Sequence, residues 1–521
     1  MSEQTEGGRS RRRRRRRTGG GHAPGSTKSP PRSARYRHLR NPYEPIEILS
    51  EDQIESIHEN SLRVLEELGI RVLLPEGRQI FRAAGADVDE DTMIVRLDRD
   101  LALESVSKAP AHLTLCARNP ERNVEVGGNA VAFSSVGGTP NTTDLERGRR
   151  PGVMKDLEDL MRLTQSFDVL HILGQSTEAT DIDASIRHLD VTYAQLTLSD
   201  KFPFVYSRGR EPVADAFEML RIAHGLSEDE FTQAVYCHTV VNTNSPRQID
   251  IPMALGIIDF ARSGQLNLLT PFTLSGAMAP VTLAGALTLQ NAEALAGIAL
   301  AQIVRPGAPV AYGGFTSNVD MKSGAPAFGT PEYTKAAFAS GQLARRYHLP
   351  WRSSNVNASN APDAQAAYES QMSLWGALMG GAHILKHGAG WLEGGLVASF
   401  EKFIIDVEML QSLAEIFEPL RTDEAELAFD ALQEVAPGGH FFGAAHTMAR
   451  YTEAFYPPLV SDWRNHGAWT EAGAPDAARR AHAIYKQTLE DYEPPPIDPA
   501  VDQALRDFVA RRKAEGGAQL A

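Results

Sequence analysis

The sequence predicts a (β/α)8 TIM barrel with an N-terminal α+β extension and a C-terminal helical extension. Eight short, apolar, β-rich runs end in small or polar residues, and each is followed by a stretch whose apolar residues recur at helical spacing. The chain of 521 residues is 42% apolar, which suffices for a core of that size. The alternative is an open doubly wound sheet, but no GxGxxG or P-loop sequence opens a helix after a strand.

The amino-terminal segment, residues 1–45, is expected to be a disordered, arginine-rich tail. Residues 1–40 hold twelve arginines and one lysine against only Glu3 and Glu6, and residues 11–17 are an unbroken arginine run. No apolar segment follows the run, which argues against a secretory signal. Because the whole chain has a net charge of −14, the remainder is strongly acidic. Nucleic-acid binding is therefore not expected except through the basic tail, which could also contact acidic lipids or an acidic protein.

Residues 46–129 are expected to form the α+β extension. Ser50 and Gln53 have the spacing of a capping box, which predicts that a helix begins after Ser50. Ile54 and Ile57 lie on one face of that helix, and Gly69 is placed to end it. The following residues have the pattern of short strands and turns.

The barrel is assigned to residues 130–420. Its eight predicted strands are residues 130–136, 169–175, 203–207, 234–241, 266–272, 309–312, 350–354 and 382–385. The amphipathic stretches between and after them include residues 153–167, 212–225, 251–263, 280–304, 331–348 and 403–420. Parallel strands that alternate with helices in this way are typical of a barrel or a doubly wound sheet.

Residues 421–521 mix helical patterns with proline-rich loops, and we expect them to pack on the barrel as a helical extension. Two cysteines, Cys116 and Cys237, cannot form a disulfide framework, and no apolar run reaches the roughly 18 residues of a membrane span. These features predict a cytoplasmic protein that does not enter membranes.

The carboxyl ends of the strands are where a barrel of this kind carries its active site. The residues at these ends are rich in Gly, Ser, Asn and aromatic types and poor in Lys, His and Cys. No HExxH or nucleophile-elbow sequence is present, so no metal site is predicted. Aromatic rings attract cations that lack N–H donors. The rings that follow or begin predicted strands are Tyr312, Phe315, Trp351 and Trp391.

Four segments resemble the trimethylamine methyltransferase family, which moves methyl groups from methylamines to corrinoid proteins. They are GGTPN at residues 137–141 with DLE at 144–146, SGAMAPVTLAGA at 275–286 with QNAE at 290–293, PDAQAAYE at 362–369, and GAGWLEGGL at 388–396. A weaker likeness covers GGHF at 438–441. The resemblance spans residues 45 to about 495, and it implies a (β/α)8 barrel.

One position departs from the trimethylamine enzymes. They carry pyrrolysine a few residues before the PDAQ segment, whereas this chain has SNVNA at residues 354–358, so that Val356 takes the pyrrolysine-equivalent position. The chain therefore resembles the branch without pyrrolysine, which includes glycine betaine:corrinoid methyltransferase. The resemblance implies a quaternary-amine substrate, no tightly bound cofactor, a methyl-accepting corrinoid carried by a separate partner protein, and a homo-oligomer.

A quaternary ammonium ion needs no general acid, because its leaving group is a neutral amine. We therefore expect the mouth to position the ion, with Trp351, Tyr312, Trp391 and Phe315 as the cage and Arg208 as the partner of a substrate carboxylate. Asn355 and Glu393 are the candidate catalytic residues, although Glu393 could equally anchor a loop. The alternatives are methyl transfer from a sulfonium donor, transfer to tetrahydrofolate, and a non-catalytic betaine-binding barrel.

Overall fold

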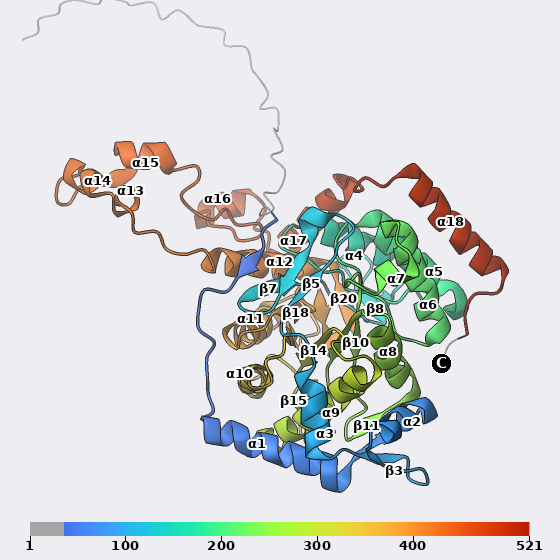
Figure 1. Cartoon of the computed structure of the whole chain (residues 1–521). Helices are drawn as coiled ribbons and strands as arrows, with labels where there is room; N and C mark the ends of the chain where they lie inside the picture. The colour runs from blue at the N-terminus through green and yellow to red at the C-terminus, as the bar shows by residue number, and fades with distance from the viewer. Residues whose placement is uncertain (1–35, 520–521) are drawn as a thin grey trace, which may run out of the picture.

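A computed structural model describes residues 36–519, and its centre is a closed ring of parallel strands (Figure 1). Five barrel strands pair with one another in the order β10–β12–β14–β17–β18. The last of them, β18, also pairs with β7, which is the first strand of the barrel. Isolated parallel bridges complete the circle from Ser134 to Ile172, from Ile172 to Phe202, and from Phe204 to His238. Eight strand positions thus close into a barrel, as the sequence predicts.

The regular strands and the helices lie within or close to the predicted segments. The barrel strands are β7 (Ala130–Phe133), β10 (His238–Val241), β12 (Leu266–Leu269), β14 (Val310–Gly313), β17 (Trp351–Ser354) and β18 (Ile384–Lys386). The helices around them are α4 (Met154–Ser166), α5 (Ala184–Leu198), α6 (Arg210–His224), α7 (Glu228–Phe231), α8 (Ile251–Arg262), α9 (Leu283–Val304), α10 (Pro331–Arg346), α11 (Ala364–Met379) and α12 (Phe400–Ile416). The second and third predicted strands, residues 169–175 and 203–207, form no regular strand. They contribute isolated bridges at Ile172, Phe202 and Phe204 instead.

The hairpin of β5 (Leu113–Leu115) and β6 (Val124–Val126) closes the amino end of the barrel. Its leucines and valines form one buried cluster with inward-facing strand residues such as Ile172, Leu268 and Ile384. The apolar floor means that any ligand must enter from the opposite end, where the strands finish.

The N-terminal extension covers one side of this barrel. Its elements are β1 (Leu39–Arg40), α1 (Glu51–Arg63), η1 (Val64–Leu68), β2 (Ile70–Val72), α2 (Pro75–Ala83), β3 (Asp87–Asp89), β4 (Ile94–Arg96), α3 (Arg99–Ser107) and η2 (Pro120–Arg122). Ser50 caps α1 through the predicted capping box with Gln53, and Gly69 ends η1 with a φ of 69°. β1 pairs with β7, so residues 36–45 belong to the folded body, and the rest of the predicted tail lies outside the described residues.

Small sheets cover the carboxyl end of the barrel. One contains β8 (Asn141–Thr143), β9 (Arg150–Pro151), β19 (Trp391–Leu392) and β20 (Val397–Ser399), with η3 (Glu393–Gly395) between the last two. The other contains β13 (Leu274–Ser275), β15 (Ser317–Val319) and β16 (Pro326–Ala327), and β11 (Gln248–Ile249) pairs with β2. These short strands hold the loops that follow the barrel strands in fixed positions.

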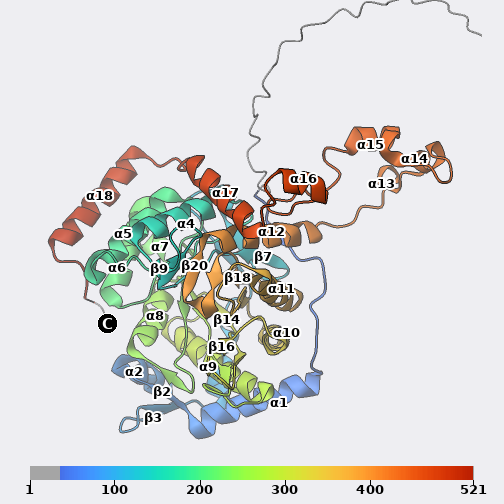
Figure 2. The ribbon, with the colours of Figure 1, turned by 180° about the vertical axis from the view of Figure 1, so that it is seen from behind.

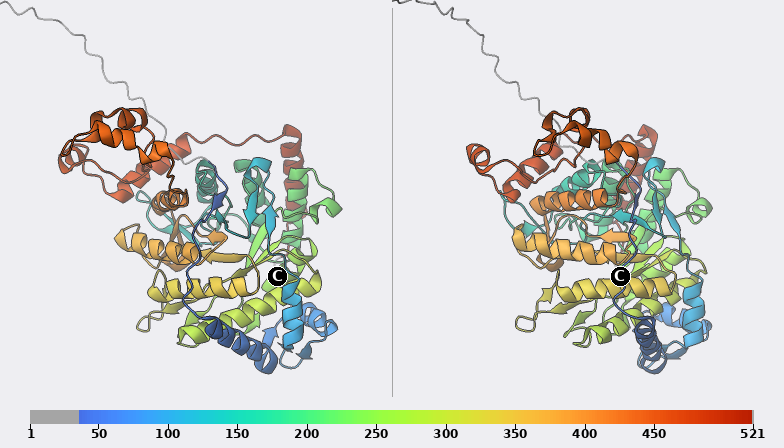
Figure 3. Two further views of the ribbon diagram at one scale, coloured as in Figure 1. Left: turned by 60° about the vertical axis from the view of Figure 1, so that its left-hand side comes forward. Right: turned by 90° about the vertical axis from the view of Figure 1, so that its left-hand side faces the viewer.

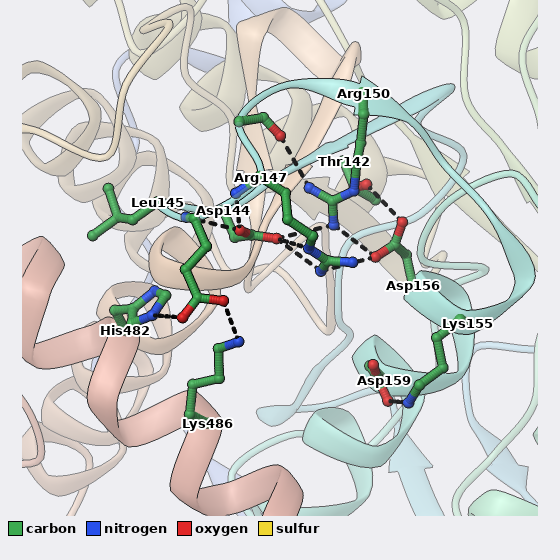
Figure 4. Close-up of polar contacts among 12 residues, drawn as sticks. Thr142, Asp144, Leu145, Arg147, Arg150, Lys155, Asp156, Asp159, His482 and Lys486 are labelled. Atoms are coloured by element: carbon green, nitrogen blue, oxygen red, sulfur yellow. Dashed lines mark hydrogen bonds and ion pairs between the residues drawn. The ribbon is translucent and has the colours of Figure 1, made fainter.

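A buried ion-pair network holds the β8–β9 hairpin (Figure 4). Asp144 and Asp156, both with fully buried side chains, share Arg147 and Arg150 at 2.7–3.2 Å. Burial raises the pKa of Asp144, but the hydrogen bonds from Arg147 and the charges of both arginines outweigh it and lower the pKa overall. The DLE segment of the family resemblance therefore has a structural role at this hairpin.

The C-terminal extension divides into two parts (Figures 1 and 2). The elements α13 (Glu424–Leu427), α14 (Phe429–Glu434), η4 (Phe441–Gly443), α15 (Ala445–Arg450) and α16 (His466–Glu471) extend away from the barrel. By contrast, α17 (Ala477–Glu490) packs on α12, and α18 (Pro499–Ala514) packs on α5 and α6. Figure 3 shows both parts from the side.

Among the described residues, helix α9 alone is long and apolar enough in length and composition to cross a membrane, although the sequence pattern did not suggest such a run. Of its most apolar stretch, 78% is buried inside the protein, where it packs between α1, α3 and α8. Its polar residues Gln290, Asn291 and Glu293 are buried as well and bond to the barrel. The helix is thus part of the core.

Candidate functional site

A cavity of about 570 Å³ lies at the carboxyl ends of the barrel strands. Residues from every part of the barrel line it, including loops after β7, β10, β12, β14 and β18. The aromatic and basic side chains in its lining are Phe204, Tyr206, Phe272, Phe315, Arg352, Lys386, His387 and Trp391. Its position and size are those of a small-molecule site in this kind of fold.

The side chain of Arg352 is a buried cation with no acidic partner among residues 36–519. The residue is 1% exposed, and its Nε and Nη1 atoms have no hydrogen-bond partner among the described residues. Its Nη2 atom lies 3.3 Å from Nε2 of His387. Burial lowers the pKa of Arg352 to about 10, so the guanidinium keeps its charge at neutral pH. An unpaired, buried donor pair of this kind is costly unless an anion enters the cavity.

Lys386, on the neighbouring strand β18, lies close enough to Arg352 for the two charges to interact. Its Nζ atom is 3.0 Å from Ser134 Oγ and 3.0 Å from His238 Nε2. Because His238 Nδ1 faces the carbonyl oxygen of Pro203 at 3.0 Å, Nδ1 carries the proton and Nε2 accepts from the lysine. Burial, and next the charge of Arg352, hold the pKa of Lys386 well below its usual range. Two basic side chains, Arg352 and Lys386, therefore line the cavity.

Aromatic rings line the wall next to the guanidinium. Phe315 is the centre of this group, with ring centroids 5.1 Å from Phe272 and 6.1 Å from Trp391. Cζ of Arg352 lies 5.5 Å from the centroid of the Phe315 ring. A ligand a few ångströms long could thus touch the guanidinium at one end and the rings at the other.

The loop after β10 forms another part of the wall, and α9 holds it in place. Glu293 accepts hydrogen bonds from the Thr243 hydroxyl, the Ser245 hydroxyl at 2.7 Å and the Arg247 backbone N–H at 2.7 Å. Burial raises the pKa of this carboxyl, although its three donors oppose the shift. The QNAE segment of the resemblance therefore positions a cavity wall from outside the barrel.

Trp351 and Tyr312, which the sequence analysis assigned to the cage, do not line this cavity. They are register partners on β14 and β17, and both side chains point outward to the helices. A Cβ at Gly341 would lie 3.0 Å from the Trp351 ring, and the Tyr312 hydroxyl donates to Asn291 Oδ1 of α9 at 3.1 Å. The inward residue is the next one along the strand, because side chains alternate between the faces of a strand. That residue on β17 is Arg352.

Arg208, the predicted carboxylate partner, already has an acidic partner. Its Nη2 atom lies 2.7 Å from Glu178 Oε1, and its Cζ lies 3.9 Å from the centroid of the Tyr206 ring. It lines a smaller pocket of about 60 Å³ that shares Gln175, Phe204 and Tyr206 with the main cavity. The charge of Arg208 is thus neutralised, while that of Arg352 is not.

The remaining predicted residues have different positions. Phe315 and Trp391 line the cavity. Asn355 is buried and donates Nδ2 to the carbonyl of Gly388 at 3.0 Å, and Val356 is fully buried beside it; neither lines the cavity. Glu393 lies on the rim, where Oε2 pairs with Nε of Arg149 at 2.9 Å. That pair is a loop anchor, which was one of the two roles considered for Glu393.

The residues at the predicted strand ends indicate a mouth poor in basic residues, whereas Arg352, Lys386 and His387 line the cavity. A signal was available, because Arg352 lies within the predicted strand 350–354 and Lys386 directly follows the predicted strand 382–385. A charged residue in such a position is rarely buried without a function. Phe272 was also missed, although it ends a predicted strand.

One further group of side chains has the composition of a metal site. Glu55, His58 and Glu59 on α1 have ligand atoms within 4.8 Å of one another. Glu55 pairs with Arg346 at 2.6 Å, and the group lies on an outer helix away from the cavity. It offers no chemistry to the candidate site.

Comparisons with known proteins agree with the resemblance noted in the sequence. Residues 9–517 match the family described as trimethylamine methyltransferase (MTTB). The chain is 36% identical to the glycine betaine methyltransferase of Desulfitobacterium hafniense strain Y51 over 90% of this chain and 98% of that protein. It is 29% identical to the trimethylamine methyltransferase MttB of D. hafniense strain DSM 10664 / DCB-2, over 90% of this chain and 94% of the relative.

Among solved structures, the monomethylamine methyltransferase (MtmB) of Methanosarcina barkeri is similar with a TM-score of 0.46. It shares 11% sequence identity, over 84% of this chain and 92% of that chain.

Proposed function

Because this chain belongs to the trimethylamine methyltransferase family, we propose that it moves a methyl group from a betaine-like quaternary amine to the Co(I) of a separate corrinoid protein. We place this reaction in the cytoplasm, and we place the substrate in the cavity at the carboxyl end of the barrel. The relatives named for glycine betaine and trimethylamine support methyl transfer as the chemistry.

The observation that carries the choice of substrate is the unpaired guanidinium of Arg352 next to the ring group of Phe272, Phe315 and Trp391. A betaine has an anionic carboxylate at one end and a methylated cation at the other. The guanidinium would accept the carboxylate through Nε and Nη1, which are unpartnered. The rings would face the onium ion, and such contacts contribute about 0.5–2 kcal/mol each.

The same arrangement disfavours a cation without a carboxylate. Two unit charges about 6 Å apart repel by roughly 3 kcal/mol at an effective dielectric constant of about 20. Trimethylammonium or choline beside Arg352 would meet that repulsion with nothing to offset it. A zwitterion places its negative end next to the guanidinium, so the attraction exceeds the repulsion.

The chemistry then requires positioning and exclusion of water rather than proton transfer. The carbon–nitrogen bond breaks, its electron pair stays on nitrogen, and the methyl carbon bonds to the cobalt of the acceptor, which is formally oxidised from Co(I) to Co(III). Glycine betaine would leave as neutral-amine dimethylglycine, so no general acid is needed. The barrel contributes a fixed orientation with the methyl groups toward the open mouth. The apolar floor keeps the ligand at that end.

The test is to mix the protein with reduced cobalamin and follow methyl-cobalamin absorbance with a panel of donors. The panel contains glycine betaine, dimethylsulfoniopropionate, choline and trimethylamine, with tetrahydrofolate as an alternative acceptor. We expect turnover with glycine betaine and little with choline or trimethylamine. Turnover with only the sulfonium, transfer only to tetrahydrofolate, or no methyl transfer from any donor would each overturn the proposal.

A further inference from the structure

The turn after β18 brings two rings into the cavity on a strained backbone. We call residues 387–391 the Trp391 turn; His387 and Trp391 line the cavity, and their ring centroids are 4.2 Å apart. His387 has a φ of 57° and Gly390 a φ of 101°, both in the left-handed region. A residue other than glycine keeps such a conformation only where the surrounding structure fixes it. Groups outside the turn must therefore hold it in place.

A buried ion pair on α12 holds the turn by a backbone N–H group. Lys402 and Asp406 are one helical turn apart, and both side chains are fully buried. One oxygen of the carboxylate pairs with Nζ of Lys402, and the other, Oδ2, accepts the backbone N–H of Gly390 at 2.8 Å. Neither side chain lines the cavity. The pair thus contacts the turn without reaching the place where a ligand would bind.

Two buried asparagines after β17 hold the carbonyl groups of the same turn. Asn355 Nδ2 donates to the carbonyl of Gly388 at 3.0 Å, and Asn357 Nδ2 donates to the carbonyl of Trp391 at 2.7 Å. Asn357 Nδ2 also lies 3.3 Å from Oγ of Ser370 on α11, and that hydroxyl accepts from the lysine of the ion pair at 2.8 Å. Ser370 therefore joins the asparagine to the ion pair in one continuous network.

Stability alone does not account for this network. A buried ion pair contributes little more than apolar side chains of the same volume, because both charges lose their hydration. Here the polar atoms of the pair reach the Trp391 turn and Ser370, and all the side chains involved are buried. A connected buried network of this kind makes its surroundings rigid. Its effect falls on the turn that carries two cavity rings.

We propose that Lys402 and Asp406 are positioning residues for the cavity. Through the N–H group of Gly390 and the hydroxyl of Ser370 they fix the turn, and the turn sets where the ring of Trp391 lies. The position of that ring then sets how closely it approaches the onium group of a betaine. The last step rests on the function proposed above, whereas the position of the ring does not.

Two double variants of the full chain separate position from charge. Lys402→Met/Asp406→Leu removes both charges and leaves the Gly390 N–H without an acceptor. Lys402→Gln/Asp406→Asn also removes both charges, but its amides keep an oxygen for that N–H and a donor for Ser370. Neither variant leaves a single charge buried without a partner. The two differ in the hydrogen bonds that hold the turn.

The position of the ring is measured by fluorine NMR on protein labelled with 5-fluorotryptophan. The chain has five tryptophans, and Trp391→Phe identifies the resonance of that residue. In the Met/Leu variant this resonance should shift or broaden, while that of Trp351 on β17 stays in place. In the Gln/Asn variant it should stay at the wild-type position. Calorimetry should show roughly tenfold weaker glycine betaine binding only in the Met/Leu variant, the loss of about one ring contact.

Lys201→Met is the matched control for the loss of a buried lysine. Lys201 is 2% exposed, and its Nζ donates to the carbonyls of Thr164 and Phe167, outside the cavity. Its variant should lose stability in urea without moving the Trp391 resonance. Ser370→Ala is a milder second test, because it removes only the hydroxyl shared by the lysine and Asn357. It should move the same resonance in the same direction.

Each result bears on a different step. A Trp391 resonance that is unchanged in the Met/Leu and Ser370→Ala variants, or that moves equally in the Gln/Asn variant or in Lys201→Met, would overturn the proposal. A moved resonance with unchanged betaine affinity would overturn the link from the ring to the substrate. If the resonance moves as expected while the wild type binds no betaine, the positioning role stands and the proposed substrate is wrong.

Discussion

Replacing Arg352 by methionine separates a ligand anchor from a structural residue. The variant keeps an unbranched side chain of similar length and removes the charge and the unpartnered Nε and Nη1 donors. In the wild type a betaine carboxylate would gain two charge-assisted hydrogen bonds from this side chain. Because the carboxylate also loses water, the net contribution is about 3 kcal/mol rather than the full Coulomb attraction. That value corresponds to a roughly 100-fold weaker dissociation constant.

Stability should change in the opposite direction. Arg352 is 1% exposed with no ion pair to any residue in the described part of the chain, so in the free protein its burial is a cost. The methionine variant should therefore melt at the same temperature as the wild type or higher. Weaker binding together with unchanged or greater stability is the signature of a site that is strained until its ligand arrives.

Isothermal titration calorimetry with glycine betaine and with choline measures the effect directly. Choline has the same trimethylammonium group without the carboxylate, so its affinity should stay the same or increase when the charge is removed. Arg208→Met is the matched control, because that guanidinium is already paired with Glu178 at 2.7 Å. Its betaine affinity should change less than threefold. Equal betaine affinity in wild type and Arg352→Met would refute the anchor, as would a larger loss in Arg208→Met.

Three further predictions concern the cage, the β8–β9 hairpin and the N-terminal strand. Trp391→Ala should weaken betaine binding by about 3- to 30-fold, measured by calorimetry, because one ring contact contributes about 0.5–2 kcal/mol. Trp351→Ala removes a buried ring outside the cavity, so it should instead lower the free energy of unfolding by about 3–5 kcal/mol, measured with urea. Equal unfolding midpoints for these two variants would contradict their placement. Asp144→Asn should destabilise the protein most above pH 4, and the effect should shrink as pH falls below 3.8, because a lowered pKa stabilises the folded state above the unfolded value of 3.8 and the gain is lost as pH falls through the folded pKa. A difference in urea midpoint that stays the same from pH 7 to the lowest pH at which both proteins are folded would exclude that linkage. A chain that begins at residue 46 should melt at a lower temperature than one that begins at residue 36, because it lacks β1 and the Arg37–Glu415 ion pair; identical melting would contradict a folded role for this segment.

Local patterns were sufficient for the architecture. The eight apolar runs predict the strand positions of the closed barrel, because each run is short, apolar and followed by helical spacing. The capping box at Ser50 and the turn at Gly69 were also readable, since both depend on neighbouring residues alone. The family resemblance depends on ordered motifs, and these too are properties of the chain.

The composition of the cavity was decided by the tertiary structure. Whether Trp351 or Arg352 faces the lumen depends on the register of β17 against β14 and β18, and a shift of one residue exchanges the two faces. In a run that is buried on both sides, composition gives no sign of which face is the inner one. The rings of Trp351 and Tyr312 are therefore expected from the sequence at positions that Arg352 and Phe315 occupy in the structure.

Ion pairs between residues far apart in the chain could not be predicted from the sequence either. Arg208 and Arg352 are both arginines near strand ends, yet only the fold brings Glu178 to the first and leaves the second without an anion. An unpaired charge is defined by what surrounds it in space. Local sequence patterns define the barrel and the family of this protein, whereas the packing of distant segments in space determines which cation is left without an acidic partner.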